Sequence, residues 1–398
     1  MSSKLLRLRT ARQRHFLPPP LLQLVPVLLL LPPSRPASAA AATAVTHLPG
    51  FDGPLPFNLE TGYVGVEEET GAELFYYFVE SERSPGTDPL LLWLTGGPRC
   101  SVIMGLAFEI GPLKFVLAPY SGGLPELVYN PYSWTKMANI LLLDSPVGSG
   151  FSFARDPKGY YVGDYSSSSQ WFTDHPQYLS NPFYIGGDSY AGKVIPLIAQ
   201  GISEGIDMRQ QPVINLKGYM VGNPIADPKF DENYKIPSAH GFGIISDQIY
   251  ESAVKNCKGD YVNPVNEMCV EVLHTINNGT TSEWIQCNIG LPYTYETPSS
   301  IPYHVNLTMK GYHALVYSGD HDLEAPFLGT QAWIRSLNFS IVADWRAWHL
   351  SGQAAGFTIE YTNNMTFATV KGAGHTAPEY RPKECFAMAQ RWLDNEPL

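Results

Sequence analysis

The chain has 398 residues, of which 44% are hydrophobic, and it carries a formal net charge of −11 at pH 7. A chain of this length and apolar content can bury a large core, which argues against a largely disordered protein. The negative charge argues against nucleic acid or an anionic membrane surface as the main partner.

Residues 1–39 have the composition of a secretory signal peptide. They hold six basic residues and no acidic residue, an apolar run over residues 21–31, and the final sequence Ala37-Ser38-Ala39. A basic start, a short apolar stretch and small residues before a cleavage point are typical of such a signal. An organelle-targeting or disordered leader is the alternative, because the basic part is long and rich in arginine. The apolar run is too short to span a bilayer, so we expect a protein of the secretory pathway without a membrane anchor.

Short apolar runs bounded by Gly, Pro or Asp recur along the chain and predict strands that are buried on both faces. They cover residues 74–79, 90–94, 140–143, 183–185, 218–221, 314–317 and 366–370. Helical stretches at residues 193–203 and 328–337 lie between some of them. This alternation predicts an α/β domain with a mostly parallel sheet. The crossover before the strand at 183 should be short, because only residues 170–179 can form its helix and Pro176 interrupts them.

A glycine-rich turn, Thr95-Gly96-Gly97-Pro98, follows the predicted strand at residues 90–94. A turn of this kind can donate a backbone N–H to a developing oxyanion in a serine hydrolase. An ordinary tight turn is the alternative.

The predicted strand at residues 183–185 runs into Gly186-Gly187-Asp188-Ser189-Tyr190-Ala191-Gly192 and then into a helix. This is the pattern of a nucleophile elbow, in which small residues flank a serine held on a tight strand-to-helix turn. Ser189 is therefore the candidate nucleophile, and the backbone N–H of Tyr190 is a candidate oxyanion donor. A serine that only caps the helix is the alternative.

Residues 225–313 contain no clear buried strand and read as an insertion that caps a site at the sheet edge. The chain has five cysteines, so at most two disulfides can form, and no pair has the CxxC spacing of a zinc site. Four Asn-x-Ser/Thr sequences are candidate glycosylation sites, namely Asn278, Asn306, Asn338 and Asn364.

Two further predicted strands end in polar turns. The strand at 314–317 leads to Asp320 and Asp322, and the strand at 366–370 leads to His375. Because both turns should lie at the carboxyl edge beside Ser189, we expect His375 as base and Asp322 as the acid that orients it, with Asp320 as the alternative acid. Asp-x-Asp with His321 could suggest a metal, but no third ligand is apparent, so we expect no metal or other cofactor.

These motifs resemble the serine carboxypeptidase-like family, peptidase family S10, and most closely its plant members. The resemblance covers residues 48–398 and rests on Leu91-Leu-Trp-Leu-Thr-Gly-Gly-Pro, Asp144-Ser-Pro-Val-Gly-Ser-Gly-Phe-Ser, Trp171-Phe-Thr-Asp-His-Pro, the turn at Ser189, Gly222-Asn-Pro, Tyr317-Ser-Gly-Asp-His-Asp and Gly372-Ala-Gly-His-Thr-Ala-Pro-Glu. It implies an α/β-hydrolase fold with a shortened cap insertion at residues 225–313. It also implies a triad of Ser189, Asp322 and His375.

The resemblance also implies an oxyanion hole and a set of disulfides. The backbone N–H groups of Gly97 and Tyr190 correspond to the oxyanion hole of the family. The cysteines correspond to two bridges, Cys257–Cys269 and Cys100–Cys287, which leave Cys385 free.

The family contains two chemistries that share an acyl-enzyme. Peptidases release a C-terminal residue, whereas acyltransferases move an acyl group from a glucose ester to an alcohol. The substrate-binding positions are Thr95, Gly96, Glu109 and Asp188. Peptidases usually have Asn and Glu where this chain has Thr95 and Asp188, so the resemblance favours an acyltransferase. Its partners would be a 1-O-acyl glucose ester and an alcohol acceptor, or otherwise the C-terminus of a peptide.

The chain departs from the family at Arg99, where the family has glycine, and in two segments that are shorter than usual. If the position needs a positive φ, arginine costs about 1–2 kcal/mol there and can displace the Gly97 N–H. The shortened segments precede Trp171 and lie between Asn277 and Gly279. An impaired homologue or a splice product is therefore the third hypothesis, after acyltransferase and peptidase.

Overall fold

The computed structural model describes residues 42–119, 122–163, 171–264, 266–277 and 293–398. The predicted leader at 1–39, the candidate glycosylation site Asn278 and the predicted disulfide partner Cys287 lie outside the described residues. Among the helices that are described, none is long and apolar enough to cross a membrane.

The central element is an eleven-stranded sheet with the strand order β1-β2-β3-β7-β4-β9-β10-β12-β15-β14-β13. The six strands from β7 to β15 in this order are parallel, and the strands at both edges are antiparallel. In sheet order the bounds are β1 Thr43–Val45, β2 Leu59–Glu67, β3 Ala72–Val79, β7 Asn139–Leu143, β4 Leu90–Leu94, β9 Phe183–Asp188, β10 Leu216–Gly222, β12 His313–Gly319, β15 Met365–Val370, β14 Gln353–Tyr361 and β13 Ile341–Leu350. All seven predicted strands are therefore confirmed.

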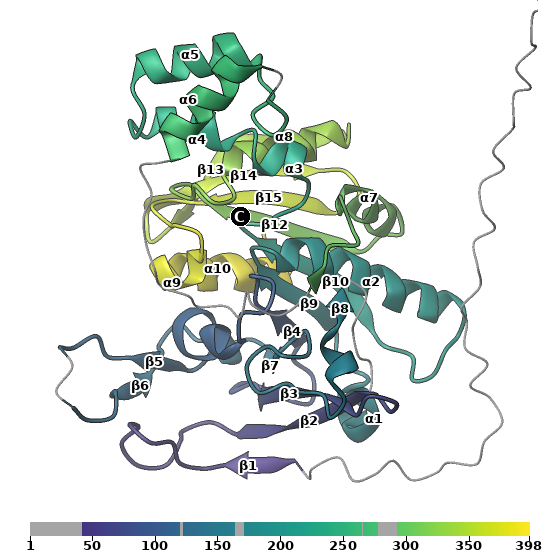
Figure 1. Ribbon diagram of the computed structural model, residues 1–398. Helices are drawn as coiled ribbons and strands as arrows, with labels where there is room; N and C mark the ends of the chain where they lie inside the picture. Colours follow the sequence, from purple (N-terminus) through teal and green to yellow (C-terminus); the bar gives the residue numbers. More distant parts are fainter. Residues whose placement is uncertain (1–41, 120–121, 164–170, 265, 278–292) are drawn as a thin grey trace, which may run out of the picture. The chain divides into compact units, whose positions relative to one another are not determined.

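Helices cover both faces of this sheet, which confirms the α/β class (Figure 1). One apolar core contains Ile195, Leu307 and Trp333 from three helices, and the other contains Met388 and Trp392. The helices are α1 Trp171–Asp174, α2 Ala191–Asp207, α3 Pro228–Asp231, α4 Lys235–Gly241, α5 Asp247–Cys257, α6 Glu267–Asn277, α7 Ile301–Met309, α8 Phe327–Ser336, α9 Ala377–Tyr380 and α10 Pro382–Leu393.

The crossover before β9 is short in its described part. It consists of the four-residue α1 and a 3-10 turn at Pro176–Tyr178, separated by His175. Pro176 occupies the first position of the 3-10 turn, where its missing N–H costs no hydrogen bond. The expected interruption at this proline is therefore present.

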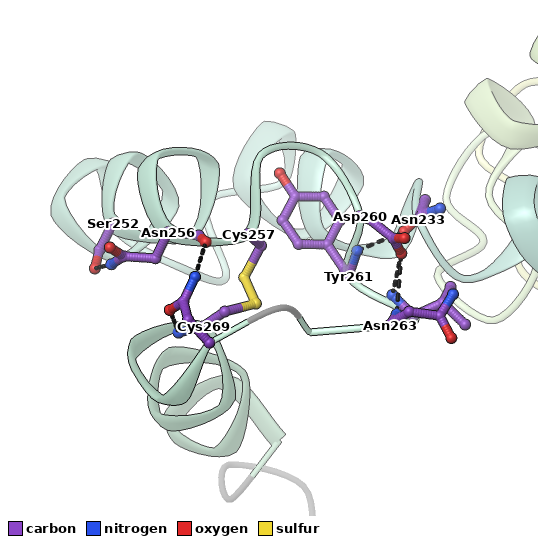
Figure 2. The surroundings of a disulfide bond; sticks show 10 residues. Asn233, Ser252, Asn256, Cys257, Asp260, Tyr261, Asn263 and Cys269 are labelled. Atoms are coloured by element: carbon purple, nitrogen blue, oxygen red, sulfur yellow. Dashed lines mark hydrogen bonds between the residues drawn. A yellow bond between two sulfur atoms is a disulfide. The ribbon is translucent and has the colours of Figure 1, made fainter. Parts of the chain in front are cut away.

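In the described part of the predicted insertion at residues 225–313, the regular structure is mainly helical, and α4, α5 and α6 lie together (Figure 1). A disulfide between Cys257 and Cys269 joins α5 to α6, as Figure 2 shows. The connection is supported by the Asn266 amide, which donates to the Asn256 carbonyl at 2.8 Å. Ala253 and Val272 pack with the two cysteines in a small core of their own. The short strand β11, Tyr293–Thr294, pairs with β8, Val162–Gly163.

Candidate active site

Ser189 lies on the turn between β9 and α2. Its φ is 56°, which is a left-handed backbone conformation that residues other than glycine rarely adopt. The neighbouring glycines are required by close packing, because a Cβ on Gly187 would lie 2.1 Å from the Leu94 carbonyl oxygen. The turn is fixed by a hydrogen bond from the Ser189 N–H to the Gly222 carbonyl at 2.9 Å. Strain in the turn therefore lifts the serine hydroxyl above the sheet edge.

His375 connects Ser189 to Asp322. Its Nε2 lies 2.8 Å from Ser189 Oγ, and its Nδ1 lies 2.9 Å from Asp322 Oδ2. The histidine follows β15 and the aspartate follows β12, so the two loops meet at the carboxyl edge of the sheet as the sequence predicts. Burial alone would lower the pKa of His375, but the hydrogen bond and charge of Asp322 outweigh it and raise the pKa.

Asp322 is held by a set of donors that sequence reasoning did not assign. Its carboxylate accepts hydrogen bonds from the Asn223 amide at 2.8 Å and from the Glu324 N–H at 2.8 Å. Burial alone would raise the pKa of Asp322, but His375 and these donors lower it. The alternative acid, Asp320, accepts the Gly372 N–H at 2.6 Å and does not bond to His375. The structure thus brings Asp322, rather than Asp320, to the imidazole.

Asn223 immediately follows β10 and is fully buried. It adopts a left-handed φ of 44°, and its Oδ1 accepts the Gly319 N–H at 3.3 Å. The signal for this residue was present in the motif Gly222-Asn-Pro, but an asparagine after a strand is equally typical of a plain turn.

Glu109 and Asp188 form a buried acidic pair beside the serine turn. Glu109 Oε2 accepts the Trp93 indole N–H at 3.2 Å, and Asp188 accepts the backbone N–H of Gly96. The other carboxyl oxygens, Glu109 Oε1 and Asp188 Oδ1, have no partner among the described residues. Burial raises the pKa of Asp188 to about 6, and burial together with the charge of Asp188 raises the pKa of Glu109. Both groups therefore retain protons at a higher pH than ordinary carboxyls.

The glycine-rich loop packs directly against the serine turn. A Cβ on Gly96 would lie 2.5 Å from the Ser189 Cβ and 2.8 Å from the Tyr190 nitrogen, so only glycine fits there. Gly97 has a φ of 121°, and Arg99 has a φ of 77°. The predicted cost of arginine at a left-handed position therefore applies. Gly97 and Tyr190 N–H groups thus belong to segments that lie side by side at Ser189.

Asp144, which follows β7, holds the far end of the same loop. Its Oδ1 accepts the Val102 N–H at 2.8 Å and the Ser101 hydroxyl at 2.9 Å. Its Oδ2 accepts the Phe151 N–H at 2.9 Å. This buried carboxylate belongs to the motif Asp144-Ser-Pro-Val-Gly-Ser-Gly-Phe-Ser, and its hydrogen bonds hold the segment that follows Arg99.

Comparison with known proteins identifies the chain. Residues 49–282 and 271–395 match the family model described as "Serine carboxypeptidase". The chain belongs to the serine carboxypeptidase family, S10. It is 46% identical to "Serine carboxypeptidase-like 3" and 45% identical to "Serine carboxypeptidase-like 7", both of Arabidopsis thaliana. Each comparison covers 90% of this chain and 94% of the relative.

These alignments run over 415 residues although they cover only 90% of this chain of 398 residues. The relatives therefore carry residues that this serine carboxypeptidase-like protein lacks. A solved structure described as a prohormone-processing carboxypeptidase, Kex1Δp of Saccharomyces cerevisiae, is similar with a TM-score of 0.65 and 20% identity. It covers 85% of this chain and 91% of its own, and the shared fold is that of the α/β-hydrolases.

The remaining predicted residues are distributed over the surface and the core. Cys100 is disulfide-bonded, and Cys385 is free and buried. The residue predicted to pair with Cys100, Cys287, lies outside the described part of the chain. The side chains of the candidate glycosylation sites Asn306, Asn338 and Asn364 are exposed.

Proposed function

We propose that Ser189, His375 and Asp322 form a catalytic triad that transfers an acyl group through an acyl-enzyme. The observation that carries this proposal is the continuous chain of hydrogen bonds from Ser189 Oγ to His375 Nε2 and from His375 Nδ1 to Asp322 Oδ2. A serine hydroxyl is a weak nucleophile until an adjacent base removes its proton. The ionised Asp322 orients the imidazole and stabilises the imidazolium that forms.

In the first half-reaction, the Ser189 oxygen attacks the ester carbonyl while its proton passes to His375 Nε2. The bond to the leaving alcohol then breaks, and the imidazolium returns the proton to that alcohol. In the second half-reaction, an acceptor hydroxyl gives its proton to His375 and attacks the acyl-enzyme. The bond between the acyl carbon and Ser189 Oγ then breaks, and the imidazolium returns its proton to the serine. The N–H groups of Gly97 and Tyr190 are the proposed donors to the oxyanion in both steps.

For the donor we favour a 1-O-acyl glucose ester, and for the acceptor an alcohol of secondary metabolism. Thr95, Gly96, Glu109 and Asp188 are the proposed substrate-binding residues. Support comes from Thr95 and Asp188, which replace the Asn and Glu usual in peptidases and so alter the site for a substrate carboxylate. Asp188 also accepts a hydrogen bond from the Gly96 N–H.

A serine carboxypeptidase is the second candidate, and one observation favours it. The raised pKa values of Glu109 and Asp188 leave protons on this pair in mildly acid solution, and such a pair can donate hydrogen bonds to a substrate carboxylate. The third hypothesis, an impaired homologue, is supported by the strained Arg99 in the proposed oxyanion loop. For all three we propose passage through the secretory pathway to the cell exterior or the vacuole.

Labelling with a fluorophosphonate tests the triad, because the probe reacts where serine, base and oxyanion donors are assembled. We expect labelling of the wild type and none of Ser189→Ala or His375→Gln. The matched control is His321→Gln, since His321 is an exposed histidine on the adjacent loop and does not touch Ser189. A folded wild-type protein that is not labelled would refute the triad and support the impaired homologue.

Competition for that label then tests the choice of substrate. We expect a 1-O-acyl glucose ester to protect Ser189 at lower concentration than an N-blocked dipeptide. Asp188→Glu should shift this order towards the peptide and bring measurable peptide cleavage, because it restores the peptidase residue. No gain of peptide cleavage between pH 4 and pH 7 would count against the role assigned to the acidic pair.

A further inference from the structure

Arg99 is a buried cation beside the serine turn. The residue is 2% exposed and lies on the loop that carries Gly96 and Gly97. None of its three guanidinium nitrogens has a hydrogen-bond partner among the described residues. The backbone around it is strained as well, with a φ of 77°.

The guanidinium remains charged in this position. Burial lowers the pKa of Arg99, but arginine starts so high that its side chain stays protonated in proteins. A buried charge is costly unless an opposite charge or hydrogen bonds compensate it. Among the described residues, the ring of Tyr293 compensates in part, since it lies 5.3 Å from the guanidinium carbon in cation–π geometry.

Lys193 is a second buried cation beside the ring of Tyr190, which contacts the Tyr293 ring edge-on at 5.8 Å. Its Nζ lies 5.8 Å from the Tyr190 ring, yet it also donates to the Pro298 carbonyl at 3.4 Å. Lys193 thus has an acceptor within the described protein, whereas Arg99 has none. The missing acceptor of Arg99 is what a bound ligand would supply.

A small cavity of about 30 Å³ lies at Arg99 and adjoins the nucleophile through Tyr190. Thr95, whose hydroxyl also has no partner among the described residues, contributes to its wall. Its small volume admits the terminal group of a substrate. Among the described residues no Asp or Glu lines it, so Glu109 and Asp188 are not part of its described wall.

We propose that Arg99 is a specificity-determining residue that binds a free carboxylate at the end of the substrate's acyl group. This inference rests on the proposed function, in which the ester carbonyl is placed at Ser189. A carboxylate matches the planar guanidinium in a two-point hydrogen bond and fits the small cavity. The proposal places this carboxylate on the acyl side because the described wall of the cavity includes neither Glu109 nor Asp188, the acidic pair proposed to bind the other end of the substrate, whereas Thr95 borders both regions.

The substrate class is therefore the ester of a short dicarboxylic acid that keeps one carboxyl free. The direct test compares mono-p-nitrophenyl glutarate with p-nitrophenyl methyl glutarate, which differs only in that its second carboxyl is neutral. Rates are corrected for hydrolysis without enzyme. We expect wild type to prefer the anionic ester by roughly tenfold to 100-fold in kcat/KM, because this is the discrimination that one hydrogen bond between charged groups provides.

In Arg99→Gln this preference should fall to about twofold or less, while turnover of the neutral ester persists; Arg99→Lys should keep part of it. The matched control is Arg209→Gln, because Arg209 is another arginine with a left-handed φ, 56°, but its side chain is exposed. The control should retain the full wild-type preference. Wild type without a preference, or Arg99→Gln with an unchanged one, would overturn the proposal.

A binding measurement separates failure of this proposal from failure of the proposed function. In Ser189→Ala, which cannot react, calorimetry should detect monomethyl glutarate and give at least tenfold weaker binding of dimethyl glutarate. Adding Arg99→Gln should abolish that difference. If fluorophosphonate labelling fails, the catalytic proposal falls while this arm still decides on Arg99. Equal binding of both esters, or no binding of either, would overturn the carboxylate site.

Discussion

Replacement of Asn223 by alanine is expected to lower both the stability and the activity of the protein. Asn223 links the end of β10 to two other loops, because its amide donates to Asp322 and its Oδ1 accepts the Gly319 N–H. The residue is fully buried, so water cannot replace the lost contacts. Loss of a hydrogen bond to a charged group costs about 1.5–3 kcal/mol.

A second cost comes from the backbone, since alanine must adopt the left-handed φ of 44°. That conformation costs a residue with a Cβ about 1–2 kcal/mol, although asparagine tolerates it better than most. Because Asn223 already bears part of this backbone cost in the wild type, the expected loss for Asn223→Ala is about 2–4 kcal/mol in the free energy of unfolding. If the free energy of the lost hydrogen bond also raises the activation barrier, kcat falls by roughly ten- to 150-fold.

Asn223→Gly separates the two contributions, because glycine removes the side chain without the backbone penalty. Urea unfolding and kcat for an acyl ester should be measured for both variants. We expect Asn223→Gly to be the more stable of the two by about 1 kcal/mol, with the same loss of kcat. The exposed, left-handed Asn395 is the matched control, and its alanine and glycine variants should keep wild-type kcat. Wild-type kcat in Asn223→Gly would refute the positioning of Asp322 by this amide.

Three further outcomes are expected. In a pH–rate profile, kcat/KM should fall as the pH drops through a midpoint above 6.5, because Asp322 raises the pKa of His375 and only neutral imidazole accepts a proton; a midpoint below 6 would contradict this. Burial lowers the pKa of His304 to about 3, so below pH 6.5 the unfolded chain binds a proton that the folded protein does not. The stability present above pH 6.5 is therefore lost on acidification, by about 2 kcal/mol between pH 7 and pH 5. Urea midpoints should therefore depend less on pH in His304→Phe than in wild type, and equal dependence would refute the assignment. The double variant Cys257→Ser, Cys269→Ser removes a disulfide with a sequence separation of 12 and should cost about 3 kcal/mol, seen as faster proteolysis of α5 and α6 with fluorophosphonate labelling retained.

The parallel strands could be predicted because they are buried on both faces. β4 and β7 consist only of buried residues. β4 is entirely apolar and in β7 four apolar residues follow Asn139, so each appears as an apolar run that ends at a polar turn. β13 could not be found in this way, since Trp348 is its only buried residue and its pairing with β14 shifts register three times. A strand at the sheet edge with both faces partly in water has no simple period that sequence reasoning can detect.

The same distinction applies to the site. Ser189, Asp322 and His375 follow predicted strand ends, and the parallel topology alone brings such positions to one edge. The pairing of Asn223 with Asp322, and of Trp93 with Glu109, depends on how side chains cross between neighbouring strands. At Arg99 the glycine pattern predicts the strained backbone, but it says nothing about the burial of the guanidinium, which depends on Tyr293 in a distant segment.

Strain is shared by three turns around this site. Arg99, Ser189 and Asn223 are all left-handed, and they follow β4, β9 and β10, which are adjacent in the sheet. Adjacent strands are separated by about 4.8 Å, so the turns that follow them lie close together at the sheet edge. The positive φ in each of these turns costs about 1–2 kcal/mol for a residue with a Cβ. Because Ser189 and Asn223 must keep their side chains to form the observed bonds, glycine cannot relieve the strain there. The Arg99 side chain makes no such bond within the described protein. A bound ligand would therefore supply the interaction that offsets its backbone strain.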